Sequence, residues 1–388
     1  MIEPFCKRAW AEVNLNRLAE NIGTIKKGLS PNTGIMAVIK ADAYGHGEGE
    51  ICHKLRETGI KYFAVSNLDE AISVRNHCED GEILILGYTP PECAEVLENY
   101  NIIQGIASPE HAKNLSDHAV KKLRCHIKID TGMGRIGLKY DTPGECADEI
   151  QEIMKLPKLS VEGLYTHFAV ADSDDSDDIE YTAKQRQFII DVYDELVSRG
   201  IKLEHLHFLN SAGACYHKKD SERSTLARIG ITMYGLYPNV NVELPYKLKP
   251  VMDFKAVISC VKTIDKGDCV SYGRTYKAEK PVKIATVTVG YADGYSRLLS
   301  SKGEMLVQGK RCRIVGRVCM DQTMIDVSEL ENVTAGEIVT LMGTDGSETI
   351  TADDIAQIYG TIGYEVVCGI SKRVPRIYIK DGKIENVM

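Results

Sequence analysis

Residues that could carry chemistry recur at the ends of short apolar runs in the first 235 residues of this chain. If the runs are parallel strands, their carboxyl ends meet at one mouth or edge, where barrel enzymes place their active sites. Lys40 ends the run Ile35-Met36-Ala37-Val38-Ile39, so its side chain would begin inside that mouth, away from water. Burial favours the neutral amine of a lysine, which can form a Schiff base. The other polar residues near run ends are Tyr44, Lys128, Arg135, His167, Asn210, Ser211 and Arg228.

Two turns of small residues are suited to a phosphate group. Ser211-Ala212-Gly213 follows the seventh run and Gly230-Ile231 follows the eighth. Barrels often bind phosphate at these two positions, with backbone N–H groups as donors. A phosphate beside a Schiff-base lysine indicates pyridoxal phosphate. Phosphorylated sugars are the alternative ligands.

The elements that must position these residues form an alternating pattern. Near-continuous apolar strands separated by helices are typical of a parallel sheet covered on both faces. Eight strands in about 235 residues favour a (β/α)₈ barrel of the TIM type. An open doubly wound sheet is the alternative, but no G-x-G-x-x-G follows the first strand. The expected strands are 35–40, 62–66, 82–87, 101–107, 123–130, 160–167, 203–210 and 226–234, and the helices between them are 47–58, 68–77, 90–98, 109–117, 143–155, 178–199 and a short segment at 212–219.

A second domain is expected beyond the barrel. Three prolines within 236–250 prevent a helix and indicate a linker, so we place the barrel at 1–240 and the second domain at 241–388. Only 351–359 is predicted to be helical there, with Thr351 as N-cap and Asp354 three residues later. An isolated strand at about 7–14 is expected to join this domain. The remaining segments predict a mainly antiparallel β domain, with strands at 251–264, 282–290, 304–308, 311–318, 322–327, 336–342 and 374–379.

The composition excludes several classes of protein. The 388 residues include 44% hydrophobic and 26% charged residues, enough for a large core in two or three domains. A net charge of −8 argues against binding the phosphate backbone of nucleic acid. We expect no signal peptide or membrane span, because no apolar run is suitable. Twelve cysteines without a C-x-x-C pair predict reduced thiols and no zinc site, in a cytoplasmic protein.

These residues occur in motifs that resemble those of the alanine racemases, the fold type III pyridoxal-phosphate enzymes. Ala37-Val38-Ile39-Lys40-Ala41-Asp42-Ala43-Tyr44-Gly45-His46-Gly47 is similar to the cofactor-lysine motif of that family. The matches span residues 37 to 376 in family order, which one chance motif could not produce. They continue at 128–135, 166–169, 210–212, 228–231, 272–273, 290–295, 319–322, 363–365 and 373–376. The family fold is a barrel followed by a β domain that the first strand joins, in agreement with the pattern above.

The resemblance implies roles for the cofactor-binding residues. Lys40 would carry pyridoxal phosphate as a Schiff base. Arg228 would face the pyridine nitrogen and keep it unprotonated, which disfavours transamination. His167 would hydrogen-bond Arg228 and pack near the ring, whereas His205 and His207 match no motif and are interpreted as structural. The remaining groups expected to hold the cofactor and its phosphate are Tyr44, Asn210, Ser211, Tyr364 and the backbone of Gly230 and Ile231.

The resemblance also implies a two-base reaction. Racemisation removes a proton from one face of Cα and returns one to the other, so two opposed bases are the simplest arrangement. Lys40 would be one base and Tyr272 the other. Arg135 would bind the substrate carboxylate. Lys128 beside Arg135 would place two cations together, which family members often resolve by carbamylating the lysine. Tyr291, Met320 and Tyr364 would crowd the substrate side chain.

The function implied is interconversion of L- and D-alanine in the bacterial cytoplasm, which supplies D-alanine for peptidoglycan. A homodimer is expected, with Tyr272 and Met320 contributed across its interface. One alternative is a racemase of this fold for serine or a broader set of amino acids. A fold type III decarboxylase is a weaker one, because its Gly-rich phosphate loop is missing. A non-catalytic pyridoxal-phosphate-binding protein is the alternative from another class, and such proteins lack the second domain.

Overall fold

The apolar runs of the first 235 residues form one parallel sheet in the computed structural model, which describes residues 7–388. Its strands are β2 (Gly34–Val38), β3 (Tyr62–Val65), β4 (Glu82–Ile85), β5 (Ile103–Ile106), β6 (Leu123–Lys128), β7 (Leu159–Tyr165), β8 (His205–His207) and β9 (Leu226–Ile229). Their order is β8-β7-β6-β5-β4-β3-β2-β9. Thr225 N donates to Leu206 O (2.8 Å) and Arg228 N donates to Leu209 O (2.9 Å), so β8 and β9 approach one another. The prediction of a TIM-type barrel is therefore confirmed.

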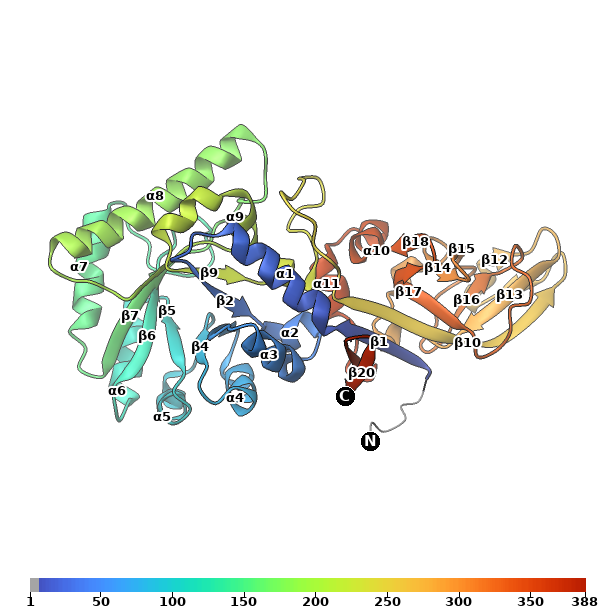
Figure 1. Cartoon of the computed structure of the whole chain (residues 1–388), viewed down its shortest axis with the longest axis horizontal. Coiled ribbons are helices and arrows are strands. Elements are labelled where there is room, and N and C mark those ends of the chain that lie inside the picture. The colour runs from blue at the N-terminus through green and yellow to red at the C-terminus, as the bar shows by residue number, and fades with distance from the viewer. Residues whose placement is uncertain (1–6) are drawn as a thin grey trace.

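Helices cover the outer face of this barrel (Figure 1). Their apolar residues point at the sheet; Leu15, Leu18, Ile22 and Ile25 of the first helix, for example, are all buried. None of the helices formed by residues 7–388 has the length and apolarity needed to cross a membrane. The helices are α1 (Leu15–Gly28), α3 (Glu48–Glu57), α4 (Leu68–His77), α5 (Ala94–Asn99), α6 (Pro109–His118), α7 (Pro143–Met154), α8 (Ser176–Ser198) and α9 (Ser211–Tyr216).

The second half of the chain forms a mainly antiparallel ten-stranded sheet, as predicted. Its strands are β1 (Ala9–Asn14), β10 (Met252–Ile264), β13 (Val282–Val287), β14 (Glu304–Val307), β15 (Lys310–Arg313), β16 (Thr323–Asp326), β17 (Ile338–Asp345), β18 (Glu348–Ile350), β19 (Arg376–Lys380) and β20 (Lys383–Val387). The main path is β15-β14-β17-β10-β1-β19-β20, and a separate small hairpin joins β11 (Cys269–Val270) to β12 (Tyr276–Lys277). β1 precedes the barrel in the chain, yet it pairs with β10 and β19 in this sheet.

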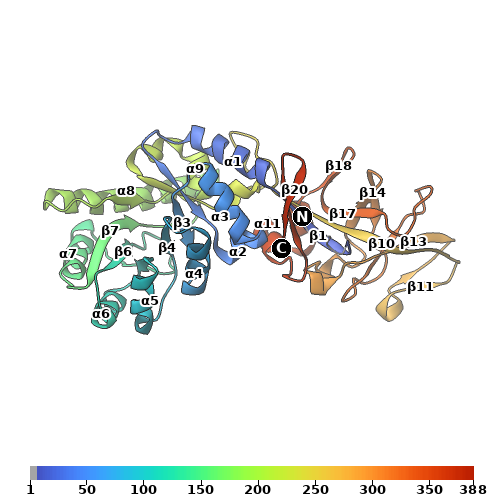
Figure 2. The same ribbon diagram turned by 60° about the horizontal axis from the view of Figure 1, so that its bottom comes forward.

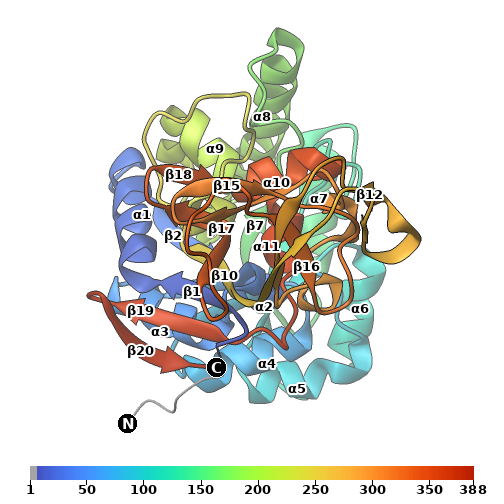
Figure 3. The same ribbon diagram turned by 90° about the vertical axis from the view of Figure 1, so that its right-hand side faces the viewer.

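The expectation of a single helix in the second domain is wrong. α10 (Ala352–Tyr359) begins after Thr351, whose hydroxyl accepts from Asp354 N, as predicted. A second helix, α11 (Gly363–Cys368), follows at once. It packs on α2 (Lys40–Gly45) where the β domain meets the barrel (Figure 3). A Cβ on Gly45 would lie 2.4 Å from Val367 O, so only glycine permits this approach. Six-residue helices carry little periodic signal, which explains the omission.

Candidate active site

A cavity of about 730 Å³ opens at the carboxyl ends of the barrel strands. It gathers residues from the carboxyl ends of seven of the eight barrel strands, and Ile362 and Tyr364 from the segment at α11, although they are spread over more than 300 positions of the sequence. Among the predicted site residues, those that line it are Lys40, Tyr44, Lys128, Arg135, His167, Asn210, Ser211, Arg228, Gly230, Ile231 and Tyr364.

Lys40 is followed by a left-handed turn. The four residues Ala41–Tyr44 all have φ between 53° and 55°, a conformation that costs L-amino acids about 1–2 kcal/mol each. Hydrogen bonds hold this turn: Ala41 N donates to Glu70 Oε1 (2.8 Å) and Gly47 N donates to Asp42 O (3.0 Å). The turn places Lys40 and Tyr44 at the same cavity. Strain that the surroundings maintain is a mark of functional backbone.

A small polar cradle lies beside this turn. Ser211 Oγ accepts a hydrogen bond from Gly230 N (2.9 Å), which leaves the Ser211 hydroxyl proton free to be donated. A Cβ at Gly230 would lie 2.7 Å from the Tyr44 hydroxyl, so the space beside Gly230 exists only because it lacks a side chain. The Tyr364 ring lies 6.2 Å from the Tyr44 ring, measured between centroids. The hydroxyl-bearing side chains of Tyr44, Ser211 and Tyr364 therefore line one space, while the Gly230 N–H is bonded to Ser211.

Asn210 lines the cavity, but its side chain supports the fold. Its Oδ1 accepts from Gly213 N (2.8 Å), and its Nδ2 donates to Phe168 O (3.4 Å). Asn210 therefore positions the turn that carries Ser211.

Arg228 is a buried cation in the barrel. Its Nη1 donates to His207 Nδ1 (3.0 Å) and to His207 O (2.8 Å), and its Nη2 donates to Thr166 O. The Tyr165 ring lies 5.5 Å from the guanidinium carbon and stacks on His207. Burial lowers the pKa of Arg228 to about 10, which leaves the side chain charged at neutral pH. The hydrogen bond predicted between His167 and Arg228 goes to His207 instead, so the interpretation of His207 as merely structural is corrected.

His167 lines the cavity as a neutral imidazole. Burial lowers its pKa to about 2, and the nearby charge of Arg228 adds to the effect. A neutral ring can pack against an apolar ligand face without repelling the cations around it.

Lys128 is a buried lysine without an ion-pair partner among residues 7–388. Burial, together with the nearby charges of Arg135 and Arg228, lowers its pKa to about 8. The neighbouring carboxylate of Asp130 is engaged elsewhere, because it accepts from Gly132 N and Gly134 N at 3.0 Å. Lys128 is therefore partly neutral near physiological pH.

Three predicted site residues do not line this cavity. Tyr272, Tyr291 and Met320 lie in the β domain and are 71%, 43% and 52% exposed. The hairpin of β11 and β12 that flanks Tyr272 lies at the end of the β domain away from the barrel (Figures 1 and 2). Within one chain, then, Tyr272 does not reach Lys40.

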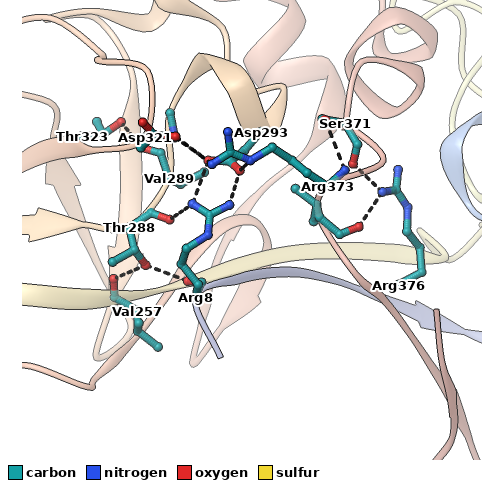
Figure 4. A network of polar contacts seen from close by, with 12 residues as sticks. Arg8, Val257, Thr288, Val289, Asp293, Asp321, Thr323, Ser371, Arg373 and Arg376 are labelled. Carbon is teal, nitrogen blue, oxygen red and sulfur yellow. Dashed lines mark hydrogen bonds and ion pairs between the residues drawn. The ribbon is translucent and has the colours of Figure 1, made fainter. Parts of the chain in front are cut away.

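A buried carboxylate holds the loop after β13. The Asp293 side chain is fully buried, forms ion pairs with Arg8 and Arg373, and accepts from Gly290 N at 3.0 Å (Figure 4). Arg373 also donates to Asp321 (2.7 Å). This network joins the first strand, two loops of the β domain and the segment before β19.

The same loops carry two exposed residues of the predicted site. Tyr291 N donates to Cys319 O and Ala292 N donates to Met320 O, both at 3.0 Å. A Cβ at Gly290 would lie 2.2 Å from Cys319 O, so the two loops meet only because residue 290 is glycine. Tyr291 and Met320 are thus held side by side on an exposed face.

Comparisons with known proteins agree over the whole chain. Residues 13–238 match the family model "Alanine racemase, N-terminal domain", and residues 251–378 match "Alanine racemase, C-terminal domain". The chain is 44% identical over 385 residues to the alanine racemase of Clostridium tetani, with 97% of each chain covered. It superposes on the crystal structure of alanine racemase from Bacillus anthracis with bound L-Ala-P, with a TM-score of 0.92, 36% identity, and 100% and 98% of the two chains covered.

A solved structure with another substrate in its name shares this fold. The histidine racemase from Leuconostoc mesenteroides subsp. sake is 28% identical, with a TM-score of 0.87 over 98% of this chain and 100% of that chain. Both matching family models and the more similar Clostridium tetani enzyme are nevertheless alanine racemases by name. The chain belongs to the alanine racemase family.

Proposed function

We propose that this chain is an enzyme that interconverts L- and D-alanine with pyridoxal phosphate attached to Lys40, and that it supplies D-alanine for peptidoglycan. The observation that carries the proposal is the cavity itself. It places a lysine, a polar cradle and a buried arginine around one space, and it adds Arg135 as a cation for the substrate carboxylate. Family membership supports the reaction.

The cradle fits the phosphate of the cofactor. The hydroxyl groups of Tyr44, Ser211 and Tyr364 and the backbone of Gly230 and Ile231 surround a space that a Cβ at residue 230 would fill. Hydroxyl and backbone N–H donors suit a dianionic phosphate. When bound, pyridoxal phosphate withdraws electrons from Cα and so acidifies its proton.

Arg228 would set the electronic state of the cofactor ring. Three of its five N–H groups are used by His207 and Thr166, which leaves two for the cavity. Arginine has no acceptor atom and holds its proton tightly, so it can donate to a pyridine nitrogen without protonating it. A neutral ring is a weaker electron sink, which favours prompt return of the proton to Cα.

Two bases would move the proton. Lys40, which lines the cavity, would serve as the base on one side of the substrate Cα. Tyr272 cannot reach this cavity within its own chain, so we assign the second base to the partner subunit's Tyr272 in a homodimer. Tyr272 and Met320 are both exposed, and their neighbours Ser271 and Cys319 are in contact, so two large side chains lie on adjoining loops where a partner could cover them. The partner's Met320 would then reach the substrate side as well.

Lys128 would act as a carbamate. Its neutral amine can add to carbon dioxide, forming an N–C bond and releasing one proton, so that a buried cation becomes an anion. The product would accept hydrogen bonds from Arg135 and hold that guanidinium toward the substrate carboxylate.

One experiment tests this proposal. Purified protein incubated with L-alanine is expected to form D-alanine, and borohydride is expected to fix the cofactor on the peptide that contains Lys40. Attachment to another lysine would refute the assignment. Cofactor binding without D-alanine would favour the non-catalytic alternative, whereas faster turnover of serine or histidine would favour a racemase with a different substrate.

A further inference from the structure

Three buried histidines form a chain beneath Arg228 inside the barrel. His207 and His205 lie on β8 and His126 lies on β6. Arg228 Nη1 donates to His207 Nδ1 (3.0 Å), and His207 Nε2 lies 2.8 Å from His126 Nδ1. The rings of His126 and His205 lie 5.4 Å apart, measured between centroids. Of the three histidines, His207 is the one that is hydrogen-bonded to Arg228.

The three histidines are not arranged as a metal site. Within residues 7–388, no group of three or more His, Cys, Asp or Glu side chains is arranged to hold a metal ion. His207 Nε2 and His126 Nδ1 are also hydrogen-bonded to each other, so neither nitrogen is available as a metal ligand.

Hydrogen-bond chemistry assigns the proton on each ring. Arginine only donates, so His207 Nδ1 must accept, and the proton of neutral His207 must be on Nε2. His207 Nε2–H then donates to His126 Nδ1, and the proton of His126 must be on Nε2. Burial keeps both rings neutral: it lowers the pKa of His126 to about 3, and it lowers the pKa of His207 well below its usual range.

The two histidines that do not bond Arg228 each have a ring nitrogen without a hydrogen-bond partner among residues 7–388. These atoms are His126 Nε2 and His205 Nδ1. Gly163 lies between the two rings, and a Cβ there would be 2.9 Å from His205 Cβ and 3.1 Å from His126 Cε1. His126 is therefore held chiefly through the one hydrogen bond that it accepts from His207.

We propose that His126 is a positioning residue, which holds His207 in the Nε2–H tautomer and thereby fixes the guanidinium of Arg228 at the cavity. Without an acceptor at position 126, His207 can move its proton to Nδ1. The Nδ1–H group would then oppose the Arg228 Nη1–H group, and two donors 3.0 Å apart repel. Arg228 would turn away from the cofactor ring; this consequence rests on the function proposed above.

Two substitutions separate this role from packing. His126→Leu removes the acceptor and keeps an apolar side chain of similar bulk. His126→Asn restores an acceptor, because its Oδ1 occupies nearly the position of the imidazole Nδ1. His111→Leu is the matched control. Like His126, His111 is buried and has one ring nitrogen in a hydrogen bond, here with Thr89 O (2.9 Å), but it lies on α6 outside the barrel.

The direct readout is the tautomer of His207, measured by ¹⁵N NMR on protein labelled at its ten histidines. Wild type, His126→Asn and His111→Leu should keep the proton on Nε2, and His126→Leu should shift it to Nδ1. His126→Leu should also alter the absorption spectrum of the bound cofactor and lower kcat about tenfold, as expected for one lost hydrogen bond. The KM for alanine should remain within about twofold, because Arg135 is untouched.

Two outcomes would overturn the proposal. One is an unchanged His207 tautomer in His126→Leu, and the other is a fall in kcat no larger than that of His111→Leu. If wild type itself shows no racemase activity, the proposed function fails, but the NMR result still decides whether His126 sets the tautomer.

Discussion

The barrel mouth and the exposed β-domain face differ in how completely one chain builds them. At the mouth, Arg228, Lys128 and Ser211 are buried and most polar groups have partners within the chain. On the β-domain face, Tyr272 and Met320 point into solvent, although the loop that carries Met320 is firmly held. Under the proposed function, the groups that would hold the cofactor are complete within one chain, whereas the second base would have to come from a partner.

Substituting the two proposed bases in separate chains tests whether they come from different subunits. Tyr272→Phe is expected to lower racemisation by about 10²- to 10⁴-fold, the usual loss of an acid–base group, without weakening cofactor binding. Lys40→Ala should be inactive as well. If the bases come from different subunits, mixing the two variants should restore activity to about one quarter of wild type, because half of the dimers are mixed and each has one intact site. The rate of D-alanine formation is measured after subunit exchange has been verified. No recovery would place both bases in one chain.

The preference for alanine over larger amino acids tests whether the exposed face of a partner subunit approaches the cavity in the proposed dimer. Tyr364, Tyr291 and Met320 should crowd the substrate side chain, so kcat/KM for alanine should exceed that for serine by about tenfold to 10²-fold. Met320→Ala should reduce the ratio of kcat/KM for alanine to kcat/KM for larger amino acids. Ile384→Ala, whose side chain is also exposed but lies on β20 at the opposite end of the sheet path from β15, should not. Equal kcat/KM for serine and alanine in the wild type would contradict the prediction.

The carboxylate under the exposed face should matter more for stability than for binding the cofactor. Asp293→Asn removes a buried charge shared by Arg8 and Arg373 and should lower the free energy of unfolding by about 1.5–3 kcal/mol. Asp321→Asn, which removes an exposed carboxylate paired with Arg373, should cost about 0–1 kcal/mol. Denaturant unfolding monitors both, and equal effects would show that burial of Asp293 is unimportant.

The smallest effect should come from Lys128 at the mouth. Because its pKa is about 8, the neutral amine that forms a carbamate predominates above that pH and falls away below it. Activity measured with and without bicarbonate should therefore differ most at alkaline pH, by about 2- to 10-fold, the value of one hydrogen bond to Arg135. Mass spectrometry of the intact protein or electron density should show the added carboxylate; an unmodified ammonium with bicarbonate present would count against the carbamate.

Local patterns of residue types are enough to predict the order of the elements and the chemistry of the cavity. Apolar runs and helical periodicity predicted the barrel and the β domain, and the residues at the strand ends predicted the cavity lining, because parallel strands bring their carboxyl ends together. Lys40 could be selected because an apolar run leads directly into it. These are local signals, and burial acts on them in the same way wherever the chain goes.

The tertiary structure alone decided which side chains meet. His207 is interpreted as structural from the sequence because it matches no family motif. Its partners Arg228 and His126 come from other strands of the barrel, so its role became visible only in the fold. The helix that brings Tyr364 to Tyr44 was missed because it is one short turn, stabilised by the approach of Val367 to Gly45. The exposure of Tyr272 likewise follows from where the β domain lies relative to the barrel. Contacts between distant segments depend on the whole packed chain, and no local pattern of residue types encodes them.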